Sequence, residues 1–347
     1  MDSRAEVRGS GRRRFIGVVA GGLLASPRRA AAQKSSDKPV RLGILGIGAA
    51  PTPEELARSV AANRFWVSMK QRGWVDGQNI VVERRFGESV EQLRAAAAEL
   101  VGLRVDVLFA GSAGLAKMLQ SQTRTIPIVV GRAEGDLVEA GLVESLAKPG
   151  RNITGSQLIN DELVPKRLEF LKALVPTLSS VVVLREGLTI AELPQIAARY
   201  DRQVVASARA LGADVRTVVV RGASDLAAAF AEMAGKPGHG VLVTSSPFMF
   251  VYRQSIVRPA MAQRIPVVYE TQVFVEAGGL MSYGVDVTEM EQRAATYVDR
   301  ILRGARPADL PIEQPTKFDL VINATTAKAM GVIIPPGLLA RADRIIS

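Results

Sequence analysis

The sequence predicts an α/β protein with two sets of parallel strands. Short β-branched runs of about four to seven residues alternate with longer amphipathic runs, which is typical of buried strands followed by helices. Repeated βα units of this kind give parallel sheets with helices on both faces. The turn-rich segment Lys148–Gly155 divides the alternation into two sets. A chain of 347 residues with 48% hydrophobic residues has enough apolar side chains for two cores.

Each set contains four predicted strands and four predicted helices, and the second set begins with a helix. In the first set, we expect strands at Val40–Leu45, Ile80–Arg85, Val105–Ala110 and Ile126–Val130, and helices at Pro53–Arg72, Val90–Leu103, Ala113–Gln122 and Asp136–Ala147. In the second, we expect strands at Val181–Leu184, Asp214–Val220, Gly240–Thr244 and Ile265–Tyr269, and helices at Glu162–Leu174, Ala191–Leu211, Ser224–Ala234 and Phe248–Arg264. A strand at Leu280–Tyr283, a helix at Val287–Leu302 and a strand at Phe318–Ile322 follow.

The N-terminus has the order of a bacterial export signal. Arginines 12–14 precede an apolar run from Gly17 to Ala25, and Ala30 and Ala32 fit a cleavage site. We expect a signal peptide over residues 1–32, a linker over 33–39 and a periplasmic product. The paired arginines resemble the Tat class, but Gly11 and Gly17 depart from its pattern, so Tat and Sec both stay open. The apolar run is too short for a membrane anchor, which needs about 20 residues.

The net charge of +10 does not indicate a nucleic-acid-binding protein. Seven arginines up to Gln33 oppose Asp2 and Glu6, so about half of the charge belongs to the export signal. The other basic residues are scattered among acidic ones and form no stripe with aromatic residues.

The composition also argues against an enzyme, a metal site or a cofactor. The chain has no cysteine, and its one histidine, His239, lies in a turn-like segment, so thiolate sites and Ser-His-Asp triads lack their usual residues. The run Gly43–Gly48 resembles a dinucleotide-binding motif, but Pro51 occupies the position of the third glycine. We predict no cofactor and no metal.

Five sequence blocks, in order and spacing, resemble the ABC transporter substrate-binding family that includes the tryptophan-binding TrpX-type receptors. They are GWVDGQNI at 73–80, KPGRNITG at 148–155, GGLMSYG at 278–284, QPTKFDLVIN at 314–323 and IPP at 334–336.

This resemblance implies a type I periplasmic-binding fold, in which two Rossmann-like lobes are joined by three hinge crossings. The crossings would lie near Gly155, Leu280 and Thr316. Lobe 1 would comprise residues 40–155 and 285–313, and lobe 2 would comprise residues 156–284 and 314–347.

Candidate ligand-binding residues follow from the rule that ligands bind beyond the carboxyl ends of parallel strands. Helix N-termini there provide free N–H donors that suit a carboxylate. The candidates are Gly48, Ser112, Ala113, Arg132, Asp136, Arg185, Ser245, Phe248, Tyr269 and Tyr283.

Most of these candidates have a structural alternative. Ser112 and Asp136 are also suitable helix caps. Arg185 would clamp a carboxylate through two hydrogen bonds or pair with Glu186 on the surface. The three aromatic residues would sandwich an apolar ligand or belong to the core.

We therefore predict a monomeric periplasmic solute-binding component of an ABC importer. It would close its lobes around a small carboxylate-bearing solute, either an amino acid or an aromatic acid, and deliver it to an inner-membrane permease. The alternatives are a sensor that passes closure to a signalling partner and a periplasmic α/β enzyme. No G-x-S-x-G motif supports the enzyme.

Overall fold

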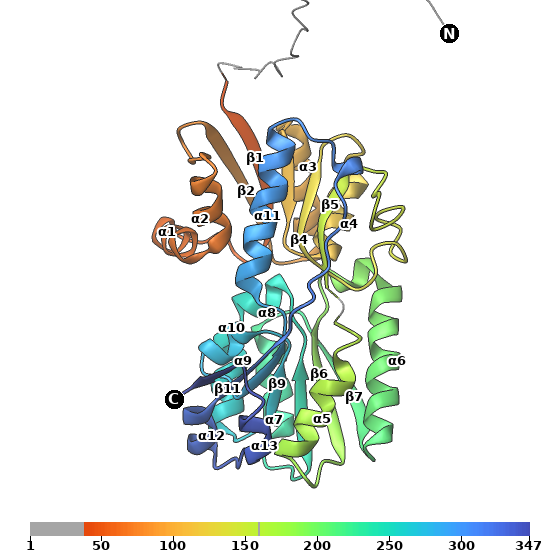
Figure 1. The fold of residues 1–347 in the computed structure, drawn as a ribbon, viewed down its shortest axis with the longest axis vertical. Coiled ribbons are helices and arrows are strands. Elements are labelled where there is room, and N and C mark those ends of the chain that lie inside the picture. Colours follow the sequence, from red (N-terminus) through yellow and green to blue (C-terminus); the bar gives the residue numbers. More distant parts are fainter. Residues whose placement is uncertain (1–37, 159) are drawn as a thin grey trace, which may run out of the picture. The chain divides into compact units, whose positions relative to one another are not determined.

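The computed structural model describes residues 38–158 and 160–347, and the part from Lys38 to Ser347 forms one unit. The predicted signal peptide, its cleavage site near Ala32 and most of the linker lie outside the described residues. Two sheets organise the described part (Figure 1).

The first sheet has five strands in the order β2-β1-β3-β4-β5, and all of its pairings are parallel. Its strands are β1 (Val40–Ile47), β2 (Ile80–Gly87), β3 (Val107–Ala110), β4 (Ile128–Glu134) and β5 (Ile153–Leu158).

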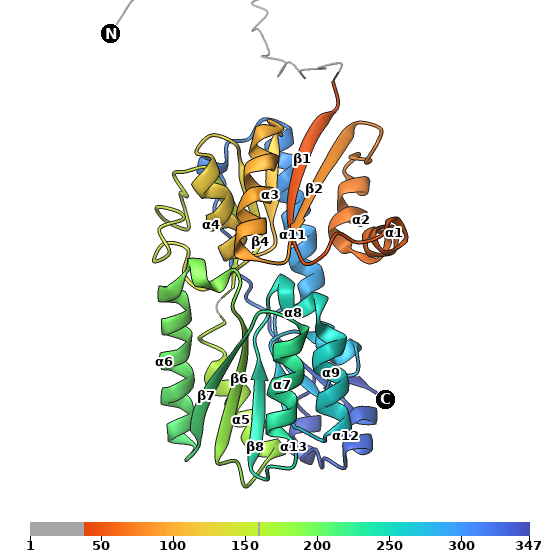
Figure 2. The same cartoon turned by 180° about the vertical axis from the view of Figure 1, so that it is seen from behind.

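Helices cover both faces of this sheet. In Figure 1, α11 lies before the sheet and beside α2, while Figure 2 shows α3 and α4 before the opposite face. We call this sheet with its helices lobe 1. The helices are α1 (Pro53–Ala62), α2 (Arg64–Gln71), α3 (Val90–Gly102), α4 (Ala113–Gln122) and α11 (Val287–Leu302).

The second sheet has seven strands in the order β12-β11-β10-β9-β8-β6-β7, and only the pair β10 and β11 is antiparallel. Its strands are β6 (Ser180–Glu186), β7 (Asp214–Val220), β8 (His239–Val243), β9 (Val267–Tyr269), β10 (Met281–Gly284), β11 (Asp319–Asn323) and β12 (Arg344–Ile346).

This sheet and its helices form lobe 2. Figure 2 shows α7 and α9, which pack together, before one face, and α5 packs on β8 and β9 from the other. The helices are α5 (Val164–Leu174), α6 (Pro194–Ala210), α7 (Ala223–Met233), α8 (Pro247–Val251), α9 (Arg253–Ala262), α10 (Gln272–Glu276), α12 (Ala324–Met330) and α13 (Pro336–Leu339).

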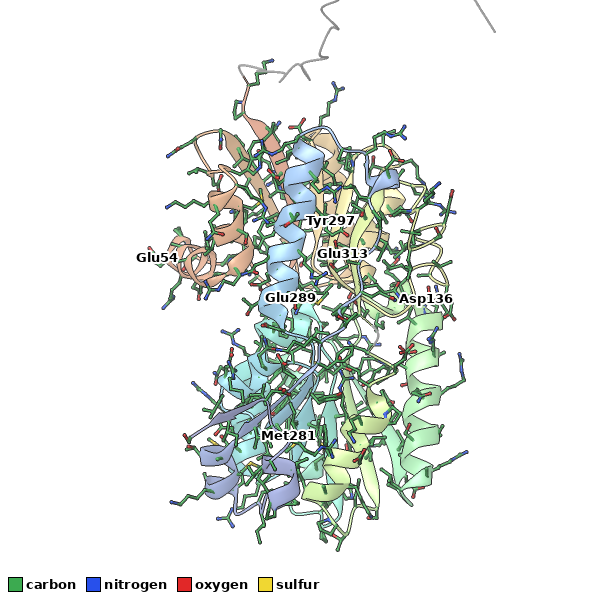
Figure 3. All side chains as sticks on the ribbon, viewed as in Figure 1. Glu54, Asp136, Met281, Glu289, Tyr297 and Glu313 are labelled. Atoms are coloured by element: carbon green, nitrogen blue, oxygen red, sulfur yellow. The ribbon has the colours of Figure 1, made fainter. Side chains whose placement is uncertain are left out.

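The chain passes between the lobes three times: after β5, between β10 and α11, and before β11. The first and third crossings run side by side, because Gln157 N donates to Glu313 O and Glu313 N donates to Gly155 O. Figure 3 shows Tyr297 of α11 beside Glu313. The predicted fold class, two mostly parallel α/β lobes with three crossings, is confirmed.

The predicted helix at Asp136–Ala147 is wrong. Asp136 Oδ1 accepts hydrogen bonds from the amides of Val138 and Glu139, and Gly141 has a φ of 67°, so the chain forms turns there. Leu137 and Leu142 of this loop are fully buried, and their spacing resembles that of apolar residues on one side of a helix.

Two long predicted helices are each divided. Asn63 has extended backbone angles (φ −85°, ψ 125°), and its side chain accepts from Phe65 N, so it ends α1 and caps α2. The predicted helix at Phe248–Arg264 is broken at Tyr252 into α8 and α9.

The end of β4 also differs from the expectation. The strand continues beyond Val130 to Glu134, with a register shift between Val130 and Ala133. It pairs with β5, which the sequence analysis treated as part of a turn-rich boundary. A side chain at Gly155 would meet Val130 O at 2.0 Å, so only glycine fits this pairing. Arg132 and Glu134 therefore lie in the strand, beyond its predicted end at Val130.

Candidate functional site

A small cavity lies between the carboxyl ends of strands from both sheets. Its volume is about 50 Å³. The lining residues are Glu134 and Gly135 after β4; Asn160 and Asp161 in the first crossing; Arg185, Glu186 and Ile190 after β6; Ile196, Ala197, Arg199 and Tyr200 on α6; Thr244, Ser245 and Ser246 after β8; and Glu270 after β9.

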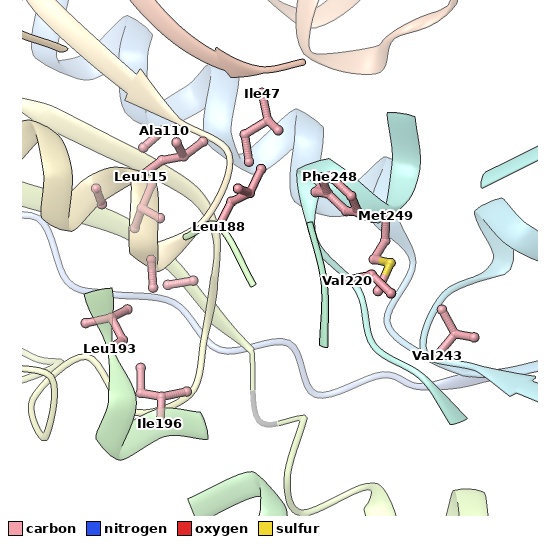
Figure 4. Close-up of a cluster of buried hydrophobic side chains, with 14 of the residues drawn as sticks. Ile47, Ala110, Leu115, Leu188, Leu193, Ile196, Val220, Val243, Phe248 and Met249 are labelled. Atoms are coloured by element: carbon pink, nitrogen blue, oxygen red, sulfur yellow. The ribbon is translucent and has the colours of Figure 1, made fainter. Parts of the chain in front are cut away.

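Apolar side chains of the two lobes meet beside this cavity. They belong to one buried cluster that includes Leu115 of lobe 1 and Leu188, Leu193 and Ile196 of lobe 2 (Figure 4). The contact is tight, because a side chain at Gly114 on α4 would meet Thr189 O at 2.4 Å. The structure thus describes the lobes in a closed arrangement.

Charged residues join the lobes at the rim. Arg94 Nη2 lies 2.8 Å from Glu192 Oε1. Arg199 Nη1 lies 3.8 Å from Asp136 Oδ2 and 3.4 Å from Glu139 Oε2, and Figure 3 shows Asp136 beside α6. These groups are partly exposed, so each pair stabilises the closed arrangement only weakly.

Glu270 forms the floor of the cavity and is buried in lobe 2. Its Oε1 accepts from Arg167 Nη1 at 3.0 Å and from Tyr200 OH at 2.9 Å. Its Oε2 accepts from Ser245 N at 2.7 Å and from Asn160 Nδ2 at 2.9 Å. Burial raises the pKa of Glu270, and the charge of Arg167 opposes that effect. With four donors, this carboxylate has little capacity to bind a further group.

Arg167 connects that floor to two of the crossings. It is fully buried on α5. Its Nε donates to Tyr283 O at 2.8 Å on β10, just before the second crossing, and its Nη1 donates to Asn160 O at 3.0 Å in the first crossing. The ion pair between Arg167 and Glu270 therefore fixes the hinge segments against the lobe 2 sheet.

Glu186 is also saturated. Its carboxylate accepts from the amides of Leu188, Thr189 and Ile190 at 2.7–3.1 Å and from Thr189 Oγ1 at 2.6 Å. This arrangement fixes the loop after β6 in the position where Thr189 meets α4.

Glu134 is partly buried, and it differs from Glu186 and Glu270 because it has few partners. Its Oε2 accepts from Ala113 N at 3.1 Å, and no described cation forms an ion pair with it. Burial, with a further contribution from Glu186, raises the pKa of Glu134 to about 7, and the charge of Arg132 opposes the shift. The hydrogen bond from Ala113 N and the charge of Arg132 compensate the burial of this carboxylate only in part.

Arg185 uses its two terminal nitrogens within lobe 2. Nη1 donates to Asp201 Oδ1 at 2.8 Å, and Nη2 donates to Asp201 Oδ2 at 3.0 Å. The two-bond clamp on a ligand carboxylate that we expected would require this pair to break. Arg185 Nε is buried and has no hydrogen-bond partner among the described residues.

Of the predicted site residues, Arg185 and Ser245 line the cavity, and Asp136 lies at its rim. Ser112 is buried and caps α4, since its Oγ accepts from Leu115 N, and Ala113 N is bonded to Glu134. Gly48 follows β1 with a φ of 101° and approaches Val251 of lobe 2. Ser112, Ala113 and Gly48 are outside the cavity lining.

Arg132 lies at a separate point of contact between the lobes. Its guanidinium lies 4.3 Å from the centre of the Phe250 ring in lobe 2. Its Nη1 is buried without a hydrogen-bond partner in the described part of the chain. Burial lowers the pKa of Arg132 to about 10, while Glu291 and Glu134 act in the opposite direction.

The predicted aromatic residues are packed inside lobe 2, outside the cavity lining. Phe248 contacts Tyr252 at 4.6 Å between ring centres, and Tyr269 stacks on Phe274 at 4.9 Å. Tyr283 meets Phe170 edge-on at 5.3 Å.

The predicted site residues do not include Asn160, Arg167, Arg199 and Tyr200. Arg167 gave a usable signal, because it occupies the apolar side of its helix together with Val164, Leu168 and Leu171. Tyr200 gave none, since a tyrosine between Ile196 and Val204 has the pattern of a core residue.

Other kinds of site find little support in the described residues. They contain no group of three or more His, Asp or Glu side chains able to hold a metal ion. His239 is at the start of β8, away from the cavity lining. Among residues 38–158 and 160–347, no helix has the length and apolar character needed to cross a membrane.

Comparison with known proteins places this architecture in a family. Residues 59–346 match the family model described as ABC transporter substrate binding protein, a family of binding proteins rather than enzymes. A tyrosine-binding protein of Clostridioides difficile (strain R20291) is 25% identical over 292 residues, which cover 82% of this chain and 80% of that protein.

Two solved structures have the same fold. One is an ABC domain from Streptococcus pneumonia in complex with L-Trp, with a TM-score of 0.74, 22% identity and coverage of 89% of this chain and 100% of that chain. The other is a conserved domain protein from Vibrio cholerae, with a TM-score of 0.74, 26% identity and the same coverage. The chain belongs to the ABC transporter substrate-binding protein family.

Proposed function

We propose that this protein is the periplasmic solute-binding component of an ABC importer and that its solute is a small carboxylate-bearing compound, an amino acid. The family supports the transport role, and the tyrosine-binding and L-Trp-bound relatives support the ligand class. The lobes would open to admit the solute and close around it, because the cavity is lined by residues of both lobes.

The observation that carries this proposal is the cavity between the two sets of strand ends. Glu134 and Gly135 come from lobe 1, and Arg185, Tyr200 and Ser245 come from lobe 2. A solute that touches both lobes binds the closed form more tightly than the open form, so it shifts the population toward closure.

The output of that shift is recognition by a permease. A monomer exported by its N-terminal signal would meet the permease at the inner membrane, and closure would distinguish loaded from unloaded protein. We propose no chemical step, since the two saturated carboxylates of the lining, Glu186 and Glu270, are fixed by protein donors.

Mass spectrometry of the solute released from purified protein, followed by calorimetric titration with that solute, L-tyrosine, L-tryptophan and glucose, tests the proposal. We expect one amino acid to bind at one site and glucose not to bind. Tight binding of glucose alone, or chemical turnover of the released solute, would contradict it.

A matched pair of variants tests whether the solute binds in the cavity. Ala197→Trp fills the cavity with an indole ring, whereas Ala198→Trp puts the same ring on the exposed side of α6. We expect at least about a hundredfold loss of affinity in the first variant and little change in the second, because a blocked pocket loses most of its ligand contacts. Equal affinities of the two variants would show that the solute binds outside this cavity.

A further inference from the structure

We infer that the cavity is built for a zwitterion: Glu134 of lobe 1 receives a ligand ammonium group, and Arg185 Nε of lobe 2 donates to the ligand carboxylate. The inference rests on the proposed function and assigns the two residues that would recognise the ammonium and carboxylate groups of the amino acid. Its basis is that most charged groups of the lining already have protein partners, whereas Glu134 and Arg185 Nε have few or none.

Four carboxylates line the cavity, and three of them are occupied. Glu270 and Glu186 each accept four hydrogen bonds from protein donors. Asp161 pairs with Arg199 Nε in the first crossing. Only Glu134 faces the cavity with a single hydrogen bond from another residue, the one from Ala113 N.

A positively charged ligand group would relieve the cost of burying Glu134. A desolvated carboxylate without a counter-ion is unfavourable, and it becomes favourable when a cation with N–H donors reaches it. The charge of Arg132 lowers the pKa of Glu134, but the Arg132 guanidinium stacks on Phe250 and makes no hydrogen bond to Glu134. The raised pKa of Glu134 is consistent with such a missing partner.

Among the lining cations of the described chain, one buried donor has no hydrogen-bond partner. Arg199 pairs with Asp161 and Glu139, and the terminal nitrogens of Arg185 pair with Asp201. Arg185 Nε remains buried and without a partner. A buried guanidinium N–H without an acceptor is costly, and a carboxylate oxygen would satisfy it.

The two free groups belong to different lobes. Glu134 is at the end of β4 in lobe 1, and Arg185 is at the end of β6 in lobe 2. A zwitterion would therefore bond to both lobes at once, whereas a simple amine or a simple acid would satisfy only one. This difference gives an amino acid the differential affinity for the closed form that closure requires.

Ligand analogues and one substitution test this inference. Wild-type protein is titrated with L-tyrosine and L-tryptophan, with the deaminated acids 3-(4-hydroxyphenyl)propionate and indole-3-propionate, and with tyramine and tryptamine. We expect each analogue to bind about 10- to 100-fold more weakly than its amino acid, as the loss of a charged hydrogen bond predicts.

In Glu134→Gln, the preference for the amino acid over the deaminated acid should fall about 10-fold or more. Glu54→Gln is the matched control, because it removes an exposed carboxylate of lobe 1, on α1, outside the cavity lining. Arg185→Lys keeps a positive charge but removes Nε, so the preference over the amine should fall, while Arg216→Lys on the exposed face of β7 should change nothing.

The outcomes separate the two proposals. If amino acids bind but the deaminated acids bind equally well and Glu134→Gln matches wild type, the zwitterion assignment is wrong and the proposed function stands. If no amino acid binds, both fail. The wild-type analogue series decides the matter even if a variant does not fold.

Discussion

Replacing Arg167 with methionine is expected to lower the free energy of unfolding by about 3–5 kcal/mol. Arg167 and Glu270 form a fully buried ion pair at 3.0 Å. The substitution leaves the Glu270 carboxylate buried without its cation, and it removes donors from the carbonyls of Tyr283 and Asn160. Urea denaturation of wild type and variant measures the loss.

The preceding residue provides the control. Lys166 pairs with Glu169 on the exposed side of the same helix, so Lys166→Met should cost less than about 1 kcal/mol. Adding Glu270→Gln to Arg167→Met should recover part of the stability, since it removes the unpaired charge. Equal losses of unfolding free energy in the two methionine variants would show that the buried pair contributes no more to stability than the exposed pair.

Replacing Gly114 with alanine should weaken solute binding by about tenfold or more without destabilising the protein. The added methyl group would meet Thr189 O at 2.4 Å, a contact that the closed lobes cannot accommodate. The loop that carries Thr189 is held by Glu186, so it cannot easily move away. Alanine is about 1 kcal/mol better than glycine within a helix, so α4 itself should tolerate the change.

Calorimetry with the bound solute and thermal melting of the solute-free protein test this pair of effects. Gly102→Ala is the control, because a side chain at the end of α3 meets nothing within 4 Å. Wild-type affinity in Gly114→Ala would mean that the contact between α4 and the loop after β6 is not part of the bound state.

The fold class was predictable because apolar runs and turn residues mark buried parallel strands directly. The errors have physical causes. At Asp136–Ala147, a buried loop has apolar residues at helical spacing, and only the Asp136 turn and the left-handed Gly141 distinguish it. The strand β5 was overlooked because its short polar sequence, ITGSQL, is buried by pairing with β4 rather than by its own hydrophobicity.

The site was only partly predictable. The rule that ligands bind at strand ends selected the loops of Arg185 and Ser245, and both residues line the cavity. Which atoms remain free depends on partners far away in sequence: Asp201 takes the two terminal nitrogens of Arg185, and Arg167 takes a share of Glu270. Such pairings are set by tertiary packing, so no local sequence pattern predicts them.

Small-angle X-ray scattering of the protein, freed of solute by unfolding and refolding and then saturated with the amino acid that binds it, tests the central claim most directly. Closure around a solute predicts that the radius of gyration decreases on saturation in wild type and decreases less in Gly114→Ala. An unchanged radius of gyration in wild type, with calorimetry showing the site filled, would contradict capture by closure.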